Sequence, residues 1–195
     1  MSLLSQKHLL GMQDITKADI RLIFDTAKQF KEVLNRPIKK VPSLRDITIA
    51  NLFFENSTRT RVSFEVGINR LGGYPLTLLK NDIQLGKSET VGDTSQVLSR
   101  FLGGMTYRCF SHDDVAELAK HADVPVLNAL SDKHHPCQAA ADLMTVLEHF
   151  DEPSEITVAW VGDGNNVLHD LMLACAMLGI DINYAVPEGY EPAED

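Results

Sequence analysis

Short apolar runs alternate with helical patterns along most of this 195-residue chain, and this alternation constrains the fold more than any other feature. The apolar runs are continuous, which is typical of strands buried on both faces of a parallel sheet. Strand candidates cover residues 47–54, 74–79, 105–110, 124–128, 156–161 and 182–186, and helix candidates cover residues 58–71, 91–101, 113–121, 136–150 and 166–178. The order predicts an α/β fold, a doubly wound parallel sheet with helices on both faces. In such sheets ligands bind at the carboxyl ends of the strands.

One more helix precedes the first strand. Thr16, with Asp19 three residues later, resembles a capping box and predicts a helix that runs to about residue 34. One face of this helix is apolar, as an amphipathic helix requires: Ile20, Ile23, Phe24, Ala27 and Phe30.

A domain boundary is expected at DEPSE, residues 151–155, where the pattern is interrupted before a new strand–GDG–helix unit. That unit has only two strand candidates, which is too little for an independent core. We therefore expect one domain over residues 1–150 and the beginning of a second α/β domain over residues 151–195. The leucines of its helix should cover an incomplete sheet and leave an apolar patch exposed: Leu168, Leu171, Leu173 and Leu178.

Composition narrows the range of partners. The formal net charge of -9 argues against nucleic-acid binding, which needs a basic surface. A few arginines can nevertheless form a local positive pocket for a small anion. No apolar run approaches the ~20 residues needed to span a bilayer, and the N-terminus has too few basic residues for a transit or signal peptide. Three cysteines without a CxxC pair indicate free thiols in a reducing compartment, so we expect a cytoplasmic protein without membrane contact.

The densest group of hydrogen-bond donors directly follows the first strand, in NSTRTR at residues 56–61. We expect a helix N-cap and first turn here, at Ser57, Thr58, Arg59 and Thr60. Free backbone N–H groups at a helix start suit a phosphate, and hydroxyls and a bidentate guanidinium add further donors. The alternative is an ordinary capped helix with surface arginines. Arg61 is expected to be structural, because Glu65 at i+4 can pair with it.

A second polar group, HHPCQ at residues 134–138, also follows a predicted strand. Pro136 suits the first helical position, which makes His135 the N-cap and Gln138 the third helical residue. Histidine can donate to a developing oxyanion and glutamine can accept from an amide. A merely capping His135 is the alternative. Zinc binding is disfavoured, because adjacent histidines face apart and no second ligand pair has suitable spacing.

Two further features are polar groups beside apolar strands. Arg108 lies in the apolar run MTYRCF, and since a buried arginine needs a partner, it is a candidate ligand for an anion. GDGNN at residues 162–166 follows a strand but lacks GxGxxG, so a dinucleotide site is disfavoured. Asn165 and Asn166 can hold polar ligand groups or simply cap a helix.

Five motifs in this order resemble the aspartate/ornithine carbamoyltransferase family: FENSTRTR with SFE, DIQLGKSET, YR at residues 107–108, HPCQ, and GDGNN-x-x-H. The resemblance runs from about residue 8 to the end. GDGNN and GYEP are similar to the ornithine-using members, whereas Lys87 lies where the aspartate-using members also have a lysine. The resemblance implies transfer of a carbamoyl group from carbamoyl phosphate to the side-chain amine of ornithine, giving citrulline and phosphate in arginine biosynthesis or catabolism, without a cofactor or metal.

The same resemblance implies a role for each matching residue. Ser57, Thr58, Arg59 and Thr60 would hold the phosphate. Thr60, Arg108 and His135 would polarise the carbonyl oxygen, and Gln138 would bind the carbamoyl NH2. Gln84 would reach into a neighbouring subunit's site in a homotrimer, and Asn166 would hold the amino-acid end of ornithine.

Two other functions stay open from the residues themselves. One is another transcarbamoylase that uses aspartate, putrescine or an acylated ornithine, and the other is a non-catalytic anion-binding or assembly module. Family members continue through a second domain with a Ser-Met-Gly loop, an aspartate and a His-Cys-Leu-Pro segment, none of which occurs here. We therefore expect the 195-residue chain alone to be inactive. No side chain stands out as a base for the attacking amine.

Overall fold

The structure is a computed structural model that describes residues 4–85, 88–150 and 153–193. Its helices are α1 (Lys17–Val33), α2 (Arg59–Arg70), α3 (Val91–Ser99), α4 (His112–His121), α5 (Pro136–His149) and α6 (Asn166–Leu178). Its strands are β1 (Thr48–Phe53), β2 (Tyr74–Leu79), β3 (Gly104–Arg108), β4 (Val126–Leu130), β5 (Thr157–Val161) and β6 (Asp181–Ala185). None of the helices in these ranges is both long and apolar enough to cross a bilayer.

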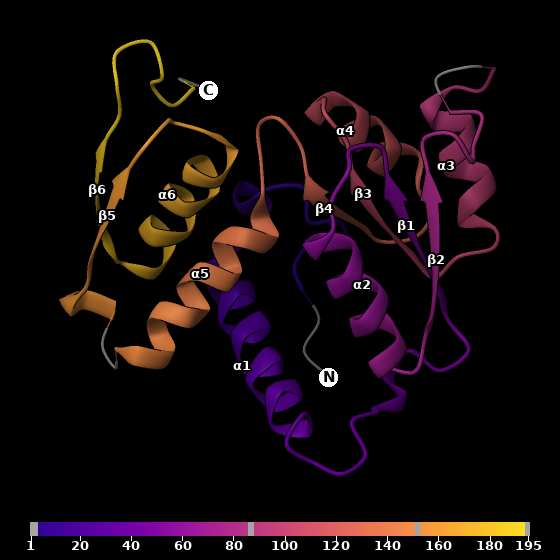
Figure 1. The fold of residues 1–195 in the computed structure, drawn as a ribbon, viewed down its shortest axis with the longest axis horizontal. Helices are drawn as coiled ribbons and strands as arrows, with labels where there is room; N and C mark the ends of the chain where they lie inside the picture. The colour runs from indigo at the N-terminus through magenta and orange to yellow at the C-terminus, as the bar shows by residue number, and fades with distance from the viewer. Residues whose placement is uncertain (1–3, 86–87, 151–152, 194–195) are drawn as a thin grey trace.

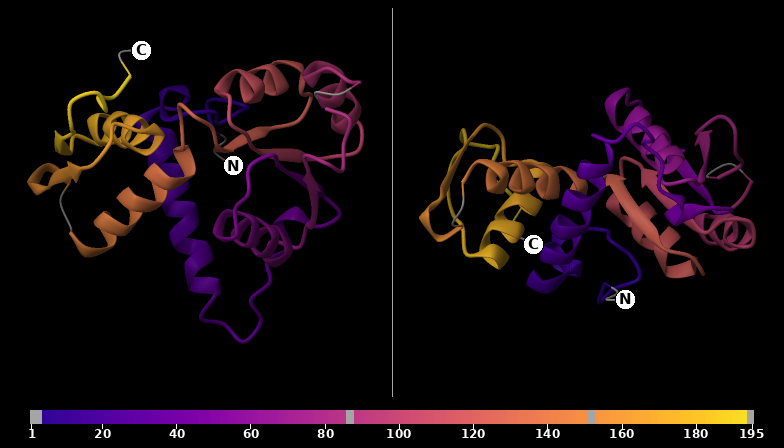
Figure 2. Two further views of the ribbon diagram at one scale, coloured as in Figure 1. Left: turned by 45° about the horizontal axis from the view of Figure 1, so that its top comes forward. Right: turned by 90° about the horizontal axis from the view of Figure 1, so that it is seen from below.

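Strands β1 to β4 form one parallel sheet in the order β2-β1-β3-β4. Helix α2 lies on one face of this sheet, and α3 and α4 pack together on the other (Figures 1 and 2). Alternation along β1 explains the two layers. Ala50 and Leu52 belong to the core under α3 and α4, whereas Ile49 faces the α2 side. The predicted doubly wound parallel sheet with helices on both faces is confirmed.

The predicted elements are all present, with ends that shift by a few residues. Both ends of β4 shift by two residues, since this strand was expected at residues 124–128 and is observed at Val126–Leu130. Pro125 has no N–H to donate to the ladder, although its carbonyl accepts from Met105 N at 2.9 Å. The strand instead extends to Leu130, whose carbonyl accepts from Cys109 N. This shift brings the carboxyl end of β4 level with that of β3.

The N-terminal helix begins as its capping box predicted. The Thr16 hydroxyl oxygen accepts from Asp19 N, and the Asp19 carboxylate accepts from Thr16 N. The same carboxylate also accepts from Ser5 N and from the Ser5 hydroxyl. These hydrogen bonds hold the pKa of Asp19 well below its usual value, with the Ser5 hydroxyl contributing most. The segment before α1 is thereby fastened to the start of that helix.

Strands β5 and β6 form a separate two-stranded parallel sheet. Helix α6 lies between this sheet and α5, and α1 runs beside α5 (Figure 1). Side chains from these helices and from the segment before α1 share one buried cluster: Met12, Ile15, Ile20, Phe24, Ala139, Leu143, Leu171, Ala174, Cys175, Leu178 and Ile180. The first part of the chain therefore covers α6.

The expectation of an exposed leucine patch on α6 is wrong for three of its four residues. Leu168, Leu171 and Leu178 are buried, and only Leu173 is exposed, at 37%. The reason is the packing of α5 and of the segment before α1 against this helix, which the local pattern does not contain. Exposed apolar side chains lie on the two-stranded sheet instead, at Val161 and Tyr184.

Candidate functional site

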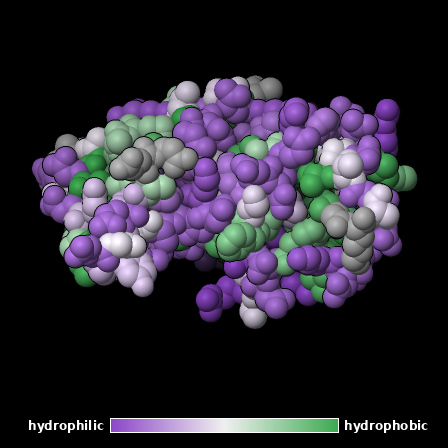
Figure 3. Space-filling view, turned by 90° about the horizontal axis from the view of Figure 1, so that it is seen from above, coloured by the Kyte–Doolittle hydropathy of each residue, from purple (hydrophilic) through white to green (hydrophobic). Residues whose placement is uncertain are grey.

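Three neighbouring strands end at the same edge of the four-stranded sheet. Phe53 of β1 lies opposite Arg108 of β3, and Arg108 lies opposite Leu130 of β4. Because the strands are parallel, the segments that follow them start side by side, at the top of the sheet in Figure 1. Figure 3 views the molecule from this side, and its surface is mostly hydrophilic with separate apolar patches. The polar motifs expected to form a site lie on these segments or at these strand ends.

The turn that precedes α2, residues 57–60, carries the donors of the first motif, and we call it the α2 turn. Thr58, not Ser57, is the N-cap, so the expected cap is displaced by one residue. Ser57 still serves the helix start, because its hydroxyl oxygen accepts from Thr60 N at 3.3 Å. Arg59 is exposed and forms no ion pair with any residue that the structure describes. The α2 turn thus presents hydroxyls, a free guanidinium and helix-start N–H groups together.

Arg61 differs from Arg59 as expected. Its Nε donates to Glu65 Oε1 at 2.9 Å, one helical turn along α2. Glu65 also accepts from the Thr77 hydroxyl, and these two bonds, with the Thr77 bond contributing most, lower the pKa of Glu65. Arg61 is therefore occupied by a structural ion pair.

Arg108, at the end of β3, is half-buried, and its Nε has no hydrogen-bond partner among the described residues. Burial lowers the pKa of Arg108, and the Glu55 carboxylate acts in the opposite direction. A guanidinium that is partly removed from water and lacks a partner favours an anion or a developing oxyanion beside it.

His135 is the N-cap of α5, as expected, but its side chain makes no capping bond. The ring is buried, at 9% exposure, and its Nδ1 has no partner in the described chain. Burial and then the charge of Arg108 lower the pKa of His135 to about 4, while Asp170 opposes the shift. The imidazole is therefore neutral near pH 7.

Gln138 and Gln84 are both exposed. Gln138 lies in the first turn of α5, where its backbone N–H donates to the His135 carbonyl at 3.0 Å and its side-chain Nε2 donates to Asp142 at 2.8 Å. Gln84 lies between β2 and α3, and its backbone carbonyl accepts from Ser88 N and Glu89 N. Lys87, from the same segment, lies outside the described residues.

The two asparagines of the GDGNN motif have different roles. Asn165 caps α6, since its side-chain oxygen accepts from Val167 N and Leu168 N. Asn166 donates from Nδ2 to the carbonyl of Ser131 at 2.6 Å. Ser131 directly follows β4, so Asn166 joins the start of α6 to the edge of the first sheet.

Sequence reasoning missed Asp170, which lies on α6 and is fully buried. Its carboxylate accepts from His135 N at 2.6 Å, from Met12 N at 2.8 Å and from His134 Nδ1 at 3.0 Å. A sequence signal did exist. Asp170 is the only Asp, Glu, Lys or Arg in the helix candidate over residues 166–178, and the eight residues that follow it, LMLACAML, are all apolar. A charge in such a stretch needs partners, but the sequence does not say which ones.

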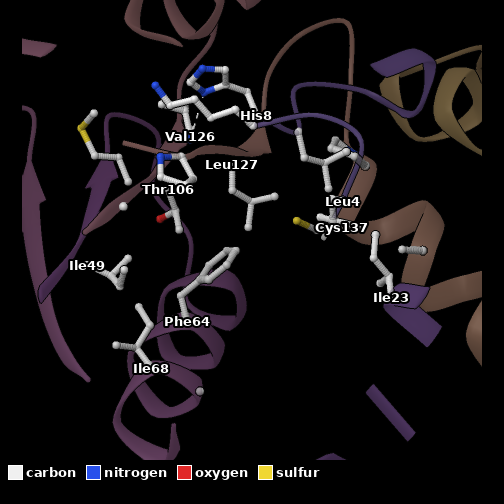
Figure 4. A pocket seen from close by; sticks show the side chains of 18 of the residues that line it. Leu4, His8, Ile23, Ile49, Phe64, Ile68, Thr106, Val126, Leu127 and Cys137 are labelled. Atoms are coloured by element: carbon white, nitrogen blue, oxygen red, sulfur yellow. Dashed lines mark hydrogen bonds between the residues drawn. The ribbon is translucent and has the colours of Figure 1, made fainter. Parts of the chain in front are cut away.

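An apolar hollow of about 630 Å³ lies beside α2, over the part of the sheet face that this helix leaves uncovered. In Figure 4, Phe64 and Ile68 of α2 lie below Ile49 and Leu127 of the strands, and Leu4 lies nearby. Neither the α2 turn nor Arg108 nor His135 lines it. A small, highly charged ligand is matched by the strand edge rather than by this hollow.

The fold and the strand edge together define an α/β protein that carries a dense group of hydrogen-bond donors at neighbouring strand ends. Among the described residues, no group of three or more His, Cys, Asp and Glu side chains could hold a metal ion. The donors available for a ligand are hydroxyls, backbone N–H groups, guanidiniums and a neutral imidazole.

Known proteins identify the family. Residues 7–148 match the aspartate/ornithine carbamoyltransferase carbamoyl-P binding domain, and residues 154–195 match the Asp/Orn binding domain of the same family. The chain belongs to the aspartate/ornithine carbamoyltransferase family, as its five motifs indicated.

Individual relatives agree. The chain is 48% identical to ornithine carbamoyltransferase of Carboxydothermus hydrogenoformans over 186 residues, which are 95% of this chain and 60% of the relative. It is also 48% identical to ornithine carbamoyltransferase of Thermococcus kodakarensis over 189 residues, covering 97% of this chain and 60% of the relative. The solved ornithine carbamoyltransferase from Pyrococcus furiosus superposes with a TM-score of 0.94 at 47% identity, covering 99% of this chain and 62% of that one. The chain thus spans about 60% of the length of these relatives.

Proposed function

We propose that this chain is part of an enzyme that transfers the carbamoyl group of carbamoyl phosphate to the side-chain amine of ornithine, giving citrulline and phosphate. Residues 1–150 would form the carbamoyl-phosphate domain, and residues 151–195 the beginning of the ornithine domain. The observation that carries this proposal is the convergence, at adjacent strand ends, of the open α2 turn with Arg108 and His135. Family membership and relatives named ornithine carbamoyltransferase support it.

The α2 turn suits the phosphate group. Arg59 is exposed and forms no ion pair within the described part of the chain, so its guanidinium can grip two phosphate oxygens. Thr58 and Thr60 add hydroxyls, and the backbone N–H groups of the first turn add donors with a favourable dipole. Ser57 Oγ already accepts from Thr60 N, and its own O–H can still donate to a ligand.

The half-buried Arg108 and the buried His135 suit the carbonyl oxygen, with Thr60 as a third donor. When the amine attacks the carbonyl carbon, negative charge grows on this oxygen. The C–O bond to phosphate then breaks, phosphate leaves with the electron pair, and the proton that the amine loses goes to the departing phosphate. A neutral imidazole with a depressed pKa polarises a carbonyl by donating a hydrogen bond rather than by transferring its proton. Because no acceptor among the described residues reaches the buried Nδ1, we assign the ring proton to Nε2.

The remaining roles involve the amide side chains. The Nε2 of Gln138 is bonded to Asp142, and its side-chain oxygen, which accepts no hydrogen bond from the described residues, can accept from the carbamoyl NH2. The side-chain oxygen of Asn166 likewise accepts none from the residues that the structure describes and can hold the amino-acid end of ornithine, while Nδ2 donates to the Ser131 carbonyl. Gln84 is exposed on its loop and could enter a neighbouring subunit's site in a homotrimer. The activity would belong to arginine metabolism, and the three cysteines without a CxxC pair favour a reducing compartment such as the cytoplasm.

The test is a carbamoyl-transfer assay of the complete open reading frame with a panel of amines. Ornithine should give citrulline at a rate well above that with aspartate, putrescine and acylated ornithine. Preference for another amine would move the protein to a different transcarbamoylase, and no transfer to any amine would contradict an enzymatic role. The 195-residue chain serves as a matched control, which should bind carbamoyl phosphate weakly and form no citrulline because positioning of the amine can contribute ~7–11 kcal/mol.

A further inference from the structure

The Asp170 carboxylate ties α6 to the residue whose imidazole faces Arg108. Asp170 Oδ2 accepts from the backbone N–H of His135 at 2.6 Å, and Oδ1 accepts from His134 Nδ1 at 3.0 Å and from Met12 N at 2.8 Å. The carboxylate is fully buried. Burying a charge is unfavourable unless several donors surround it, and here three donors from two distant segments do so.

The backbone around His135 is held on its other side as well. The His134 carbonyl accepts from Ser131 N at 2.9 Å, and the His135 carbonyl accepts from Gln138 N at 3.0 Å. His135 itself has φ -142° and ψ 66°, outside the helical region. Asp170 supplies the bond that fixes the amide side of this peptide.

The ring of His135 has no comparable anchor. Its Nδ1 is buried and has no hydrogen-bond partner in the ranges that the structure describes, and its side chain does not cap α5. The direction of the imidazole is therefore set by the backbone that carries it and by the packing around it. A change in the His134–His135 peptide would turn the ring relative to Arg108.

We propose that Asp170 is a positioning residue for His135, through which α6 aims the imidazole at the carbonyl oxygen of carbamoyl phosphate. This inference rests on the proposed function for the identity of the ligand. Asp170 itself touches no substrate in this arrangement. The second unit of the chain would thus contribute to carbonyl activation before any of its own residues meets the amine.

The consequence is a separation between binding and turnover. The α2 turn does not involve Asp170, so ground-state binding of the phosphate should survive its loss. A displaced imidazole would instead weaken the interaction that grows as the carbonyl oxygen becomes negative. In the complete protein, Asp170→Ala should lower kcat on the order of 10- to 100-fold while KM for carbamoyl phosphate changes by less than about threefold.

Asp170→Asn and Leu171→Ala provide the comparison. Asparagine keeps the shape and one acceptor oxygen, but its NH2 group opposes one of the three donors, so kcat should fall between wild type and Asp170→Ala. Leu171 is the next residue of α6 and is buried in the cluster with α1 and α5, without a hydrogen bond to His135. Leu171→Ala should destabilise the protein and leave kcat of the folded enzyme within about twofold of wild type.

A second readout does not need activity. The 13C and 1H signals of the His135 ring, assigned by their loss in His135→Gln, should shift or broaden in Asp170→Ala and stay in place in Leu171→Ala. Unchanged ring signals in Asp170→Ala, or a kcat equal to that of Leu171→Ala, would overturn the proposal. If the wild-type protein transfers no carbamoyl group, the proposed function fails, and the ring signals alone decide whether Asp170 positions His135.

Discussion

Helices α2 and α5 both begin at the carboxyl edge of the same sheet, but their first residues are in opposite environments. The α2 turn exposes Thr58 and Arg59, and Arg59 has no ionic partner among the described residues. At α5, the His135 backbone is tied on both sides, and its ring is buried. Donors in water lose much of their strength to solvent, whereas oriented donors in a dry site act strongly on a charge that develops beside them. The carboxyl edge of one sheet can therefore combine an exposed region suited to capturing an anion with a buried region suited to stabilising a transition state.

The largest expected effect is at the α2 turn. Arg59→Ala should abolish carbamoyl-phosphate binding and leave the fold intact, because this exposed guanidinium has no partner to lose in the described chain. Arg59→Lys should restore little, since an ammonium cannot reproduce a bidentate grip. Isothermal titration calorimetry on protein with an unchanged circular dichroism spectrum measures this. Wild-type affinity in Arg59→Ala would show that the α2 turn does not bind the phosphate.

The next-largest effect distinguishes Arg108 and His135 from the α2 turn. In the complete protein, Arg108→Ala and His135→Ala should each reduce turnover on the order of 100-fold or more, and reduce ground-state binding less. The reason is that both side chains meet the oxygen on which charge grows during attack. Steady-state kinetics beside direct binding measurements give both quantities. Near-wild-type turnover in either variant would show that its assigned role is wrong.

A pH series sharpens the contrast between buried and exposed donors. The folded pKa of His135 is about 4, below the ~6.5 of an unfolded chain, so the unfolded state binds more protons between these values. The stability of the wild type should therefore fall as the pH drops from about 7 towards 4. His135→Gln removes this contribution, so the wild type should lose on the order of 1–3 kcal/mol relative to the variant over this window.

Chemical denaturation of the 195-residue chain and its variants at each pH measures this difference. Arg59→Ala is the control, because arginine does not titrate between about pH 7 and pH 4. The free energy of unfolding of this variant should therefore change with pH in parallel with that of the wild type. Parallel curves for wild type and His135→Gln would mean that His135 is not held neutral by burial.

The smallest effect is expected one residue beyond the α2 turn. Arg61→Ala should change carbamoyl-phosphate affinity by less than about twofold and stability by at most ~0.5 kcal/mol, because its partner is a partly exposed i,i+4 carboxylate. Glu65 keeps its bond from the Thr77 hydroxyl in this variant. Calorimetry and thermal unfolding beside Arg59→Ala make the comparison. A loss of binding as large as in Arg59→Ala would place Arg61 in the site.

Much of the site could be predicted because its residues follow strands and begin helices. Pro136 predicted that His135 starts α5, and Glu65 at i+4 predicted the partner of Arg61. These are short-range relations, which residue type and spacing largely determine. The N-cap at Thr58, one residue beyond the expected Ser57, shows that such relations place a helix end only to within about one residue. Neighbouring hydroxyl residues compete for the same capping position.

Asp170 shows what could not be predicted. It lies 35 residues from His135 and 158 residues from Met12, yet one carboxylate bonds to both backbones. Only the packing of α6 against α5 and the segment before α1 brings these donors together. The same packing buries the α6 leucines that were expected to be exposed.

By itself, the sequence determined the order of strands and helices, the parallel sheet and the segments that carry the donors, because apolar periodicity and capping act over a few residues. The tertiary structure decided which hydrogen-bond donors are buried away from water and which are exposed to solvent. It buried His135 beside Arg108, left Arg59 in solvent and enclosed Asp170. The physical reason is that burial, and with it the pKa and strength of a hydrogen-bonding group, depends on segments distant in the chain that pack against it.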